Sequence, residues 1–338
     1  MNRIRILLGL IIFIFTAGCQ QVDQQGSAAD IDESTDSKKL KVVATTTIVG
    51  DVVSQVGGEL IELSVLLPVG TDPHGFDATP QDVAKLVESD IVFANGAGLE
   101  DFLESMIESA GAEDKVIYVS DGIKLISGEH HDEDEGEEHH DEDEGEEHHD
   151  EDEGEEHHDH GHAGNDPHTW FSPSNVMVWA HNISEALGKV DSGNSQTYIA
   201  NEENYREELT ELDAWIREQV AQIPEMNRNL VTDHSVFAYY GQEYGFTQVG
   251  ALIPGYSTLA EPTAKELAQV EDAIEQLNVK AVFVGYTFNP ALAERVTSDT
   301  GTQLVFVYTG SLSEPEGEAS TYLNYMRYNT TAFVNALK

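Results

Sequence analysis

Residues 41–67, KVVATTTIVGDVVSQVGGELIELSVLL, alternate between strand-like and helix-like segments. The β-branched run at 41–45 predicts a strand, the apolar spacing of 48–56 predicts a helix, and 61–67 predicts a second strand. The alternation continues through strands at 90–94 and 115–119. Strands separated by helices of this length favour a mainly parallel, doubly wound α/β sheet.

The same alternation starts again after one long helical segment. Residues 195–223 predict a helix of about 40 Å, because each helical residue adds ~1.5 Å. Strands at 229–232, 248–253, 279–285 and 303–308 then alternate with helices. The predicted fold class is therefore α/β, with two doubly wound lobes joined by one long rigid helix. The expected divisions are an N-terminal lobe at 40–190, a linking helix at 191–224 and a C-terminal lobe at 225–338.

The N-terminal segment is typical of a secreted lipoprotein. Arg3 and Arg5 precede an apolar run at 6–17, which is too short for a membrane span and suits a signal peptide. Small residues lead to Cys19, the one cysteine of the chain, which excludes an internal disulfide and a thiolate-rich metal site. We expect a signal peptide at 1–18 and a lipidated Cys19 with a flexible tether at 19–39. The alternative is an ordinary signal peptide with an incidental cysteine.

The chain is strongly acidic, with a formal net charge of -46, and 20 of its 63 acidic residues lie within 129–159. Nucleic acid is therefore a poor partner, and cations are good ones. Residues 130–156 hold three copies of HHDEDEGEE, and this composition predicts a disordered loop at 129–162 that binds metal weakly. The alternative is an acidic solubilising loop in which histidine is incidental. The ten histidines of this segment are His130, His131, His139, His140, His148, His149, His157, His158, His160 and His162.

Four further histidines lie outside this loop. His74 and His168 each follow an Asp-Pro pair just before a predicted helix, and His234 follows a predicted strand. Ligands of open α/β sheets bind beyond the carboxyl ends of strands, and imidazole is the commonest metal-binding side chain. These three residues are therefore candidate metal ligands in a cleft between the lobes. His181 lies within a helical pattern and is expected on a helix surface, without a ligand role.

Five motifs resemble the cluster A-I metal-binding lipoproteins, the zinc/manganese solute-binding family. They are PVGTDPHGFDATPQD at 68–82, DPHTWFSP at 166–173, DHSVFAYYGQEYGF at 233–246, EPTAKEL at 261–267 and MRYNTTAF at 326–333. The resemblance covers nearly all of residues 41–338. It implies a metal held between two lobes by His74 and His168 from the first lobe and His234 from the second. Zinc members also carry a similar histidine-rich loop between the first two ligands.

One position departs from the family pattern. The family usually carries a fourth ligand, an Asp, after the last strand, where this chain has Gly310. The stretch at 284–286, where some relatives carry a Glu, also lacks an acid. The fourth ligand stays open. It could be water, a side chain of the acidic loop, or, after rearrangement, one of Glu314, Glu316 and Glu318. Three imidazoles without a carboxylate favour Zn²⁺, with Mn²⁺ as the second choice.

These features predict a high-affinity zinc receptor that delivers its ion to an ABC importer. The expected partners are a membrane permease, the divalent metal and membrane lipid through Cys19. The protein is expected to be an extracytoplasmic monomer, lipid-anchored at the cell surface or in the periplasm, and not an enzyme. A zinc hydrolase is the alternative of another class, but it lacks a clear general base other than Asp233. A surface metal buffer without a permease is the third hypothesis.

Overall fold

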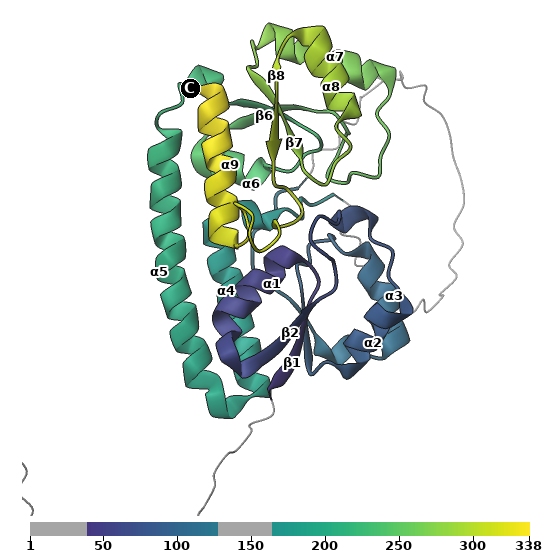
Figure 1. Cartoon of the computed structure of the whole chain (residues 1–338), viewed down its shortest axis with the longest axis vertical. Coiled ribbons are helices and arrows are strands. Elements are labelled where there is room, and N and C mark those ends of the chain that lie inside the picture. The colour runs from purple at the N-terminus through teal and green to yellow at the C-terminus, as the bar shows by residue number, and fades with distance from the viewer. Residues whose placement is uncertain (1–38, 128–163) are drawn as a thin grey trace, which may run out of the picture. The chain divides into compact units, whose positions relative to one another are not determined.

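The computed structural model describes residues 39–127 and 164–338. Residues from Lys39 to Lys338 form one compact unit that contains two four-stranded sheets (Figure 1). The predicted signal peptide, lipidated Cys19, tether and histidine-rich loop lie outside the described residues. Within the described ranges, no helix combines the length and apolarity that a membrane span needs.

The first lobe is built on a parallel sheet of strand order β2-β1-β3-β4. Val42, Ala44 and Phe93 of its central strands are almost fully buried, as expected when helices cover both faces of a parallel sheet. The elements of this lobe are β1 (Leu40–Ala44), α1 (Thr47–Gly57), β2 (Ile61–Val65), α2 (Pro80–Glu88), β3 (Ile91–Ala94), α3 (Asp101–Ala110), β4 (Val116–Tyr118) and α4 (Pro173–Val190).

The second lobe repeats the topology, with the parallel order β6-β5-β7-β8. Each sheet reverses its strand order beside its first strand, at β1 and at β5. In open α/β sheets, such a reversal creates a crevice at the carboxyl ends of the strands. The elements are β5 (Asn229–Thr232), α6 (Ala238–Tyr244), β6 (Thr247–Ala251), α7 (Ala264–Gln276), β7 (Ala281–Gly285), α8 (Ala291–Thr300), β8 (Gln303–Val307) and α9 (Tyr322–Leu337).

One long helix, α5 (Ser195–Val220), connects the two lobes. Its 26 residues pack against α1 and α4 of the first lobe and against α9 of the second (Figure 1). Tyr205, Leu209 and Leu212 form part of its buried stripe. The predicted class of two doubly wound lobes joined by a long helix is confirmed.

Aromatic side chains fill the junction between the lobes. Trp170 of the first lobe donates its ring N–H to the Tyr325 hydroxyl of α9 at 3.0 Å, and the Tyr322 hydroxyl donates to the Trp170 carbonyl at 2.7 Å. Phe171 is fully buried beside them, and burial of such a side chain contributes about 1.5–3 kcal/mol. We call Trp170, Phe171, Tyr322 and Tyr325 the aromatic junction. It fixes the two lobes close to the strand ends where the histidines lie.

Candidate metal centre

The three candidate histidines meet at the carboxyl ends of the two sheets. The Nε2 atom of His168 lies 3.3 Å from that of His74 and 3.2 Å from that of His234. Ligand atoms of all three lie within 4.8 Å of one another, as required for binding one ion. Nitrogens bound to a tetrahedral zinc at ~2.0–2.1 Å lie roughly 3.3–3.4 Å apart. The observed spacing therefore fits a metal site with little rearrangement.

The second Asp-Pro-His segment holds His168 rigidly. Asp166 Oδ1 accepts the backbone N–H of His168 at 2.9 Å and lies 2.7 Å from its ring Nδ1. The Asn95 amide, at the end of β3, donates to the carbonyl of Pro167 at 3.0 Å. A carboxylate on Nδ1 fixes the ring and leaves Nε2 as the lone-pair donor. Asp166 and His168 are almost completely buried, so this ring has little freedom to turn.

His234 is oriented in the same manner by its neighbour. It follows β5 directly, and its ring Nδ1 lies 2.6 Å from Asp233 Oδ1. The other Asp233 oxygen accepts the backbone N–H of Gly285, at the end of β7, at 2.6 Å. The carboxylate therefore lies behind the ring, on the side opposite Nε2. Asp233 orients the ligand and is poorly placed to act as the general base of a hydrolase.

The first Asp-Pro-His segment uses its carboxylate differently. Asp72 caps the short 3-10 helix Pro73–Gly75, and its Oδ1 accepts the backbone N–H of His74 at 3.0 Å. Its Oδ2 accepts the hydroxyl of Thr258, which belongs to the second lobe, at 2.5 Å. His74 is also the one partly exposed residue of the three. Sequence analysis identified the histidines but missed the roles of Asp72, Asp166 and Thr258. The repeated Asp-Pro-His pattern was the sequence signal that could have pointed to Asp72 and Asp166.

A small cavity of about 10 Å³ lies among the histidines, on the scale of one water molecule or ion. Glycines stand at both positions where a family carboxylate was considered. A Cβ at Gly310 would lie 2.6 Å from Cδ of Pro73, and one at Gly285 would lie 2.2 Å from Thr309 Oγ1. A larger side chain would therefore displace the loops that close the site. In this arrangement, neither position supplies a carboxylate ligand.

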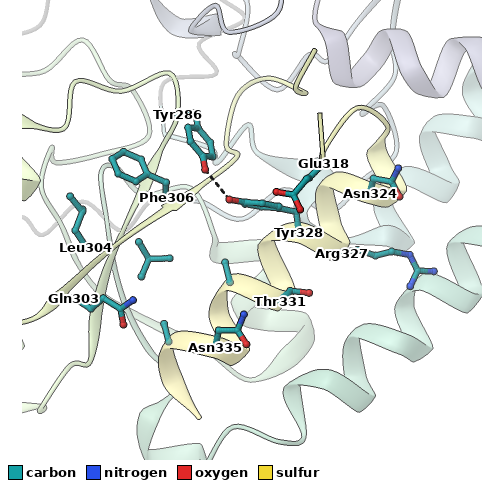
Figure 2. A pocket seen from close by; sticks show the side chains of 13 residues that line it. Tyr286, Gln303, Leu304, Phe306, Glu318, Asn324, Arg327, Tyr328, Thr331 and Asn335 are labelled. Carbon is teal, nitrogen blue, oxygen red and sulfur yellow. Dashed lines mark hydrogen bonds between the residues drawn. The ribbon is translucent and has the colours of Figure 1, made fainter. Parts of the chain in front are cut away.

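The other candidate residues lie away from the cavity. Glu314, Glu316 and Glu318 are exposed and do not line it. Glu318 instead lines a groove of about 620 Å³ between β8 and α9, where the hydroxyls of Tyr286 and Tyr328 are 2.8 Å apart (Figure 2). This larger groove contains no histidine, so the metal centre is not the largest cavity of the described residues. His181 lies on α4 with a 60% exposed side chain, 3.3 Å from Glu202, as expected for a helix-surface residue.

Burial keeps two of the candidate ligands, His74 and His168, neutral. Burial first, and then the nearby charges of His168 and His234, lower the pKa of His74 to about 3. Burial also lowers the pKa of His168 well below its usual range. Burial raises the pKa of Asp166 to about 7. Burial also acts to raise the pKa of Asp233, but the charge of His234 and the hydrogen bonds to the carboxylate outweigh it, so the pKa of Asp233 is lowered. Neutral imidazole is the metal-binding form, so two of the rings are ready to bind.

These pKa shifts predict that metal affinity depends weakly on pH. Three imidazoles with an ordinary pKa near 6.5 would together lose about a thousandfold in affinity between pH 7.5 and 5.5. With a folded-state pKa below that value, His74 and His168 take up few protons in this window, so we expect a loss of about tenfold or less. Competition titrations at both pH values measure the loss. A thousandfold fall would contradict the lowered pKa values.

Comparison with known proteins places this chain and its two-lobed fold among the metal-binding substrate-binding proteins. The chain matches the family model described as "Zinc-uptake complex component A periplasmic" over residues 42–336 and belongs to that family. It is 30% identical to the manganese-binding lipoprotein MntA of Halalkalibacterium halodurans, covering 97% of this chain and 96% of that protein. It is also 30% identical to the metal ABC transporter lipoprotein SsaB of Streptococcus sanguinis, with 88% of each chain covered.

Solved structures agree with the fold. A structure of TroA has 26% sequence identity and a TM-score of 0.73, and the match covers 89% of this chain and 100% of that one. The periplasmic zinc-binding protein TroA of Treponema pallidum has 24% identity and a TM-score of 0.74, with 88% and 99% covered. The chain is a metal-binding substrate-binding protein of an ABC importer, and not an enzyme. Such proteins bind a divalent metal and work with a membrane permease.

Proposed function

We propose that this protein is a high-affinity zinc receptor that delivers the ion to its ABC importer. His74, His168 and His234 are the proposed ligands, each through Nε2. The observation that carries the proposal is the convergence of these atoms at 3.3 and 3.2 Å around a cavity of one-ion size. Solvent water supplies the fourth position in this proposal.

The choice of zinc rests on the donor atoms. Imidazole suits Zn²⁺, whereas Mn²⁺ favours carboxylate oxygens. The described cavity lining contains two carboxylates, Asp72 and Asp233, and both are engaged by other groups. Several similar relatives are named for manganese, so manganese is the alternative cargo. Manganese would require a hard oxygen ligand to move into the site.

The N-terminal sequence and the names of similar proteins support a proposal for where the receptor lies. We propose a signal peptide at 1–18 and a lipidated Cys19 with a tether at 19–39, which hold the folded unit at the outer side of a membrane. Similar proteins are named lipoproteins of ABC transporters, which supports this location. A monomer is proposed, because all three candidate histidine ligands come from a single chain.

The histidine-rich segment at 129–162 is proposed to capture metal weakly before it enters the main site. Its flanking residues are close together, since Ser127 and Asn165 form a β-bridge and the Asp166 N–H donates to the Ile126 carbonyl at 2.7 Å. The segment can therefore be removed without separating the strands of the lobe. Joining its ends leaves Asp166 and His168 in place.

Deletion of residues 129–162 tests this division of roles. We expect the intact chain to bind one zinc ion tightly and several weakly. The deleted chain should keep the tight site, with a zinc affinity within about threefold of that of the intact chain, because the site lies outside the segment. Isothermal titration of both chains with Zn²⁺ gives the stoichiometry and the affinities. Loss of the tight site on deletion would contradict the three-histidine assignment.

A further inference from the structure

Two identical tripeptides present His74 and His168, but their carboxylates have different partners. Asp166 Oδ1 lies 2.7 Å from the Nδ1 of its own histidine, whereas Asp72 holds only the backbone N–H of His74. Asp72 turns its second oxygen across the cleft to Thr258, at 2.5 Å. His74 thus lacks the ring support that the other two histidines have among the described residues, and it depends on a contact with the opposite lobe.

The contact lies at the outer edge of the cleft. Thr258 belongs to the loop between β6 and α7, residues 252–263, which we call the latch loop. The ring of Tyr256 in the same loop lies 6.5 Å from that of His168, and Leu259 lies beside Gly75, which follows His74. The latch loop therefore covers the first ligand turn. The aromatic junction also holds the lobes together, through buried side chains and hydrogen bonds.

The rest of the first ligand turn is held by the loop after β8. The Gly70 N–H donates to Ser311 Oγ at 2.9 Å, and Gly310 lies against Pro73. These contacts fix the start of the turn and its proline. The backbone N–H of His74 itself donates to Asp72 Oδ1. The other carboxylate oxygen of Asp72, Oδ2, accepts the hydrogen bond from Thr258.

We propose that Thr258 is a positioning residue that retains the bound metal by holding Asp72 and, through it, His74. On this proposal, which rests on the proposed metal site, His74 is the ligand that leaves first during release. Movement of Thr258 away from the first lobe breaks its hydrogen bond to Asp72 and frees the least supported ligand, while His168 and His234 keep their carboxylate partners. A permease that displaced the exposed Leu259 would open the same contact.

The first test measures the rate of metal release. Full-length chain in detergent is loaded with Zn²⁺ and mixed rapidly with excess chelator. Thr258→Val removes the hydroxyl with little change of shape, and we expect zinc dissociation about tenfold faster, since a hydrogen bond to a charged group is lost. Thr258→Ser is expected to stay within about twofold of the wild type, because it restores the donor. Thr210→Val is the matched control, because Thr210 is exposed on α5 and its hydroxyl donates to the Arg206 carbonyl within that helix, away from the cavity.

An unchanged rate in Thr258→Val, or an equal increase in Thr210→Val, would overturn the proposal. The second test uses metal-free chain and is independent of the cargo. Amide hydrogen exchange should accelerate at His74 in Thr258→Val and stay unchanged at His168, whose N–H is bonded to Asp166. Equal exchange at His74 in both chains would also overturn it. If the wild type failed to bind zinc tightly, the proposed function would fail, whereas the exchange test would still decide the role of Thr258.

Discussion

Replacement of His234 by alanine is expected to weaken zinc binding at the main site by at least about a thousandfold, well above the ~10–100-fold typical of residues that only orient a ligand. His234 is the proposed ligand from the second lobe, and its Nε2 lies 3.2 Å from that of His168. Without it, the two remaining imidazoles both come from the first lobe, so the metal no longer joins the lobes. Competition against a chelator of known affinity measures the loss.

His181→Ala is the matched control for this experiment. His181 is a histidine outside the repeat segment, but it lies on the exposed side of α4 next to Glu202. Its removal should leave the tight zinc affinity within about twofold, as is usual for surface substitutions. A similar loss in both variants, or an intact tight site in His234→Ala, would show that the ligand set is wrong.

Zinc is expected to bind this site on the order of a hundredfold more tightly than manganese, because zinc stands far above manganese in the usual order of affinities for nitrogen donors. The two glycines strengthen the expectation. Gly310 and Gly285 stand where carboxylates were considered, and each is packed so closely that a Cβ would displace a neighbouring group. A site without these oxygens lacks the hard ligands that manganese prefers.

The secondary structure was predictable because its local signals are strong. The strand Asn229–Thr232 has the predicted limits, and β3 (Ile91–Ala94) lies within the strand predicted at 90–94. The predicted ends of strands were less accurate where backbone hydrogen bonding continues past the regular strand. Leu66 and Leu67, predicted as strand, follow β2 but still donate to the carbonyls of Ala44 and Thr45. Apolar patterning detects burial of these leucines and does not detect where the pairing becomes irregular.

The meeting of the three candidate histidines was also predictable, since His234 follows β5 and the two Asp-Pro-His segments each precede a helix. The supporting contacts were not. The hydrogen bond from Thr258 to Asp72 joins residues 186 positions apart, and the contact between Gly310 and Pro73 likewise crosses the cleft. Such pairs depend on how closely the lobes approach, which no local pattern encodes. For the same reason, two identical Asp-Pro-His tripeptides gave no sign that their carboxylates serve different purposes.

The central claim is that three imidazoles make this a zinc receptor. It is tested most directly by competitive titration of chelator-stripped chain, from Gln21 onward, with Zn²⁺ and Mn²⁺. One tight zinc site, with manganese weaker on the order of a hundredfold, is the result expected from the nitrogen donors. A manganese site as tight as the zinc site would contradict the claim. It would show that a carboxylate enters the centre and that manganese is the cargo.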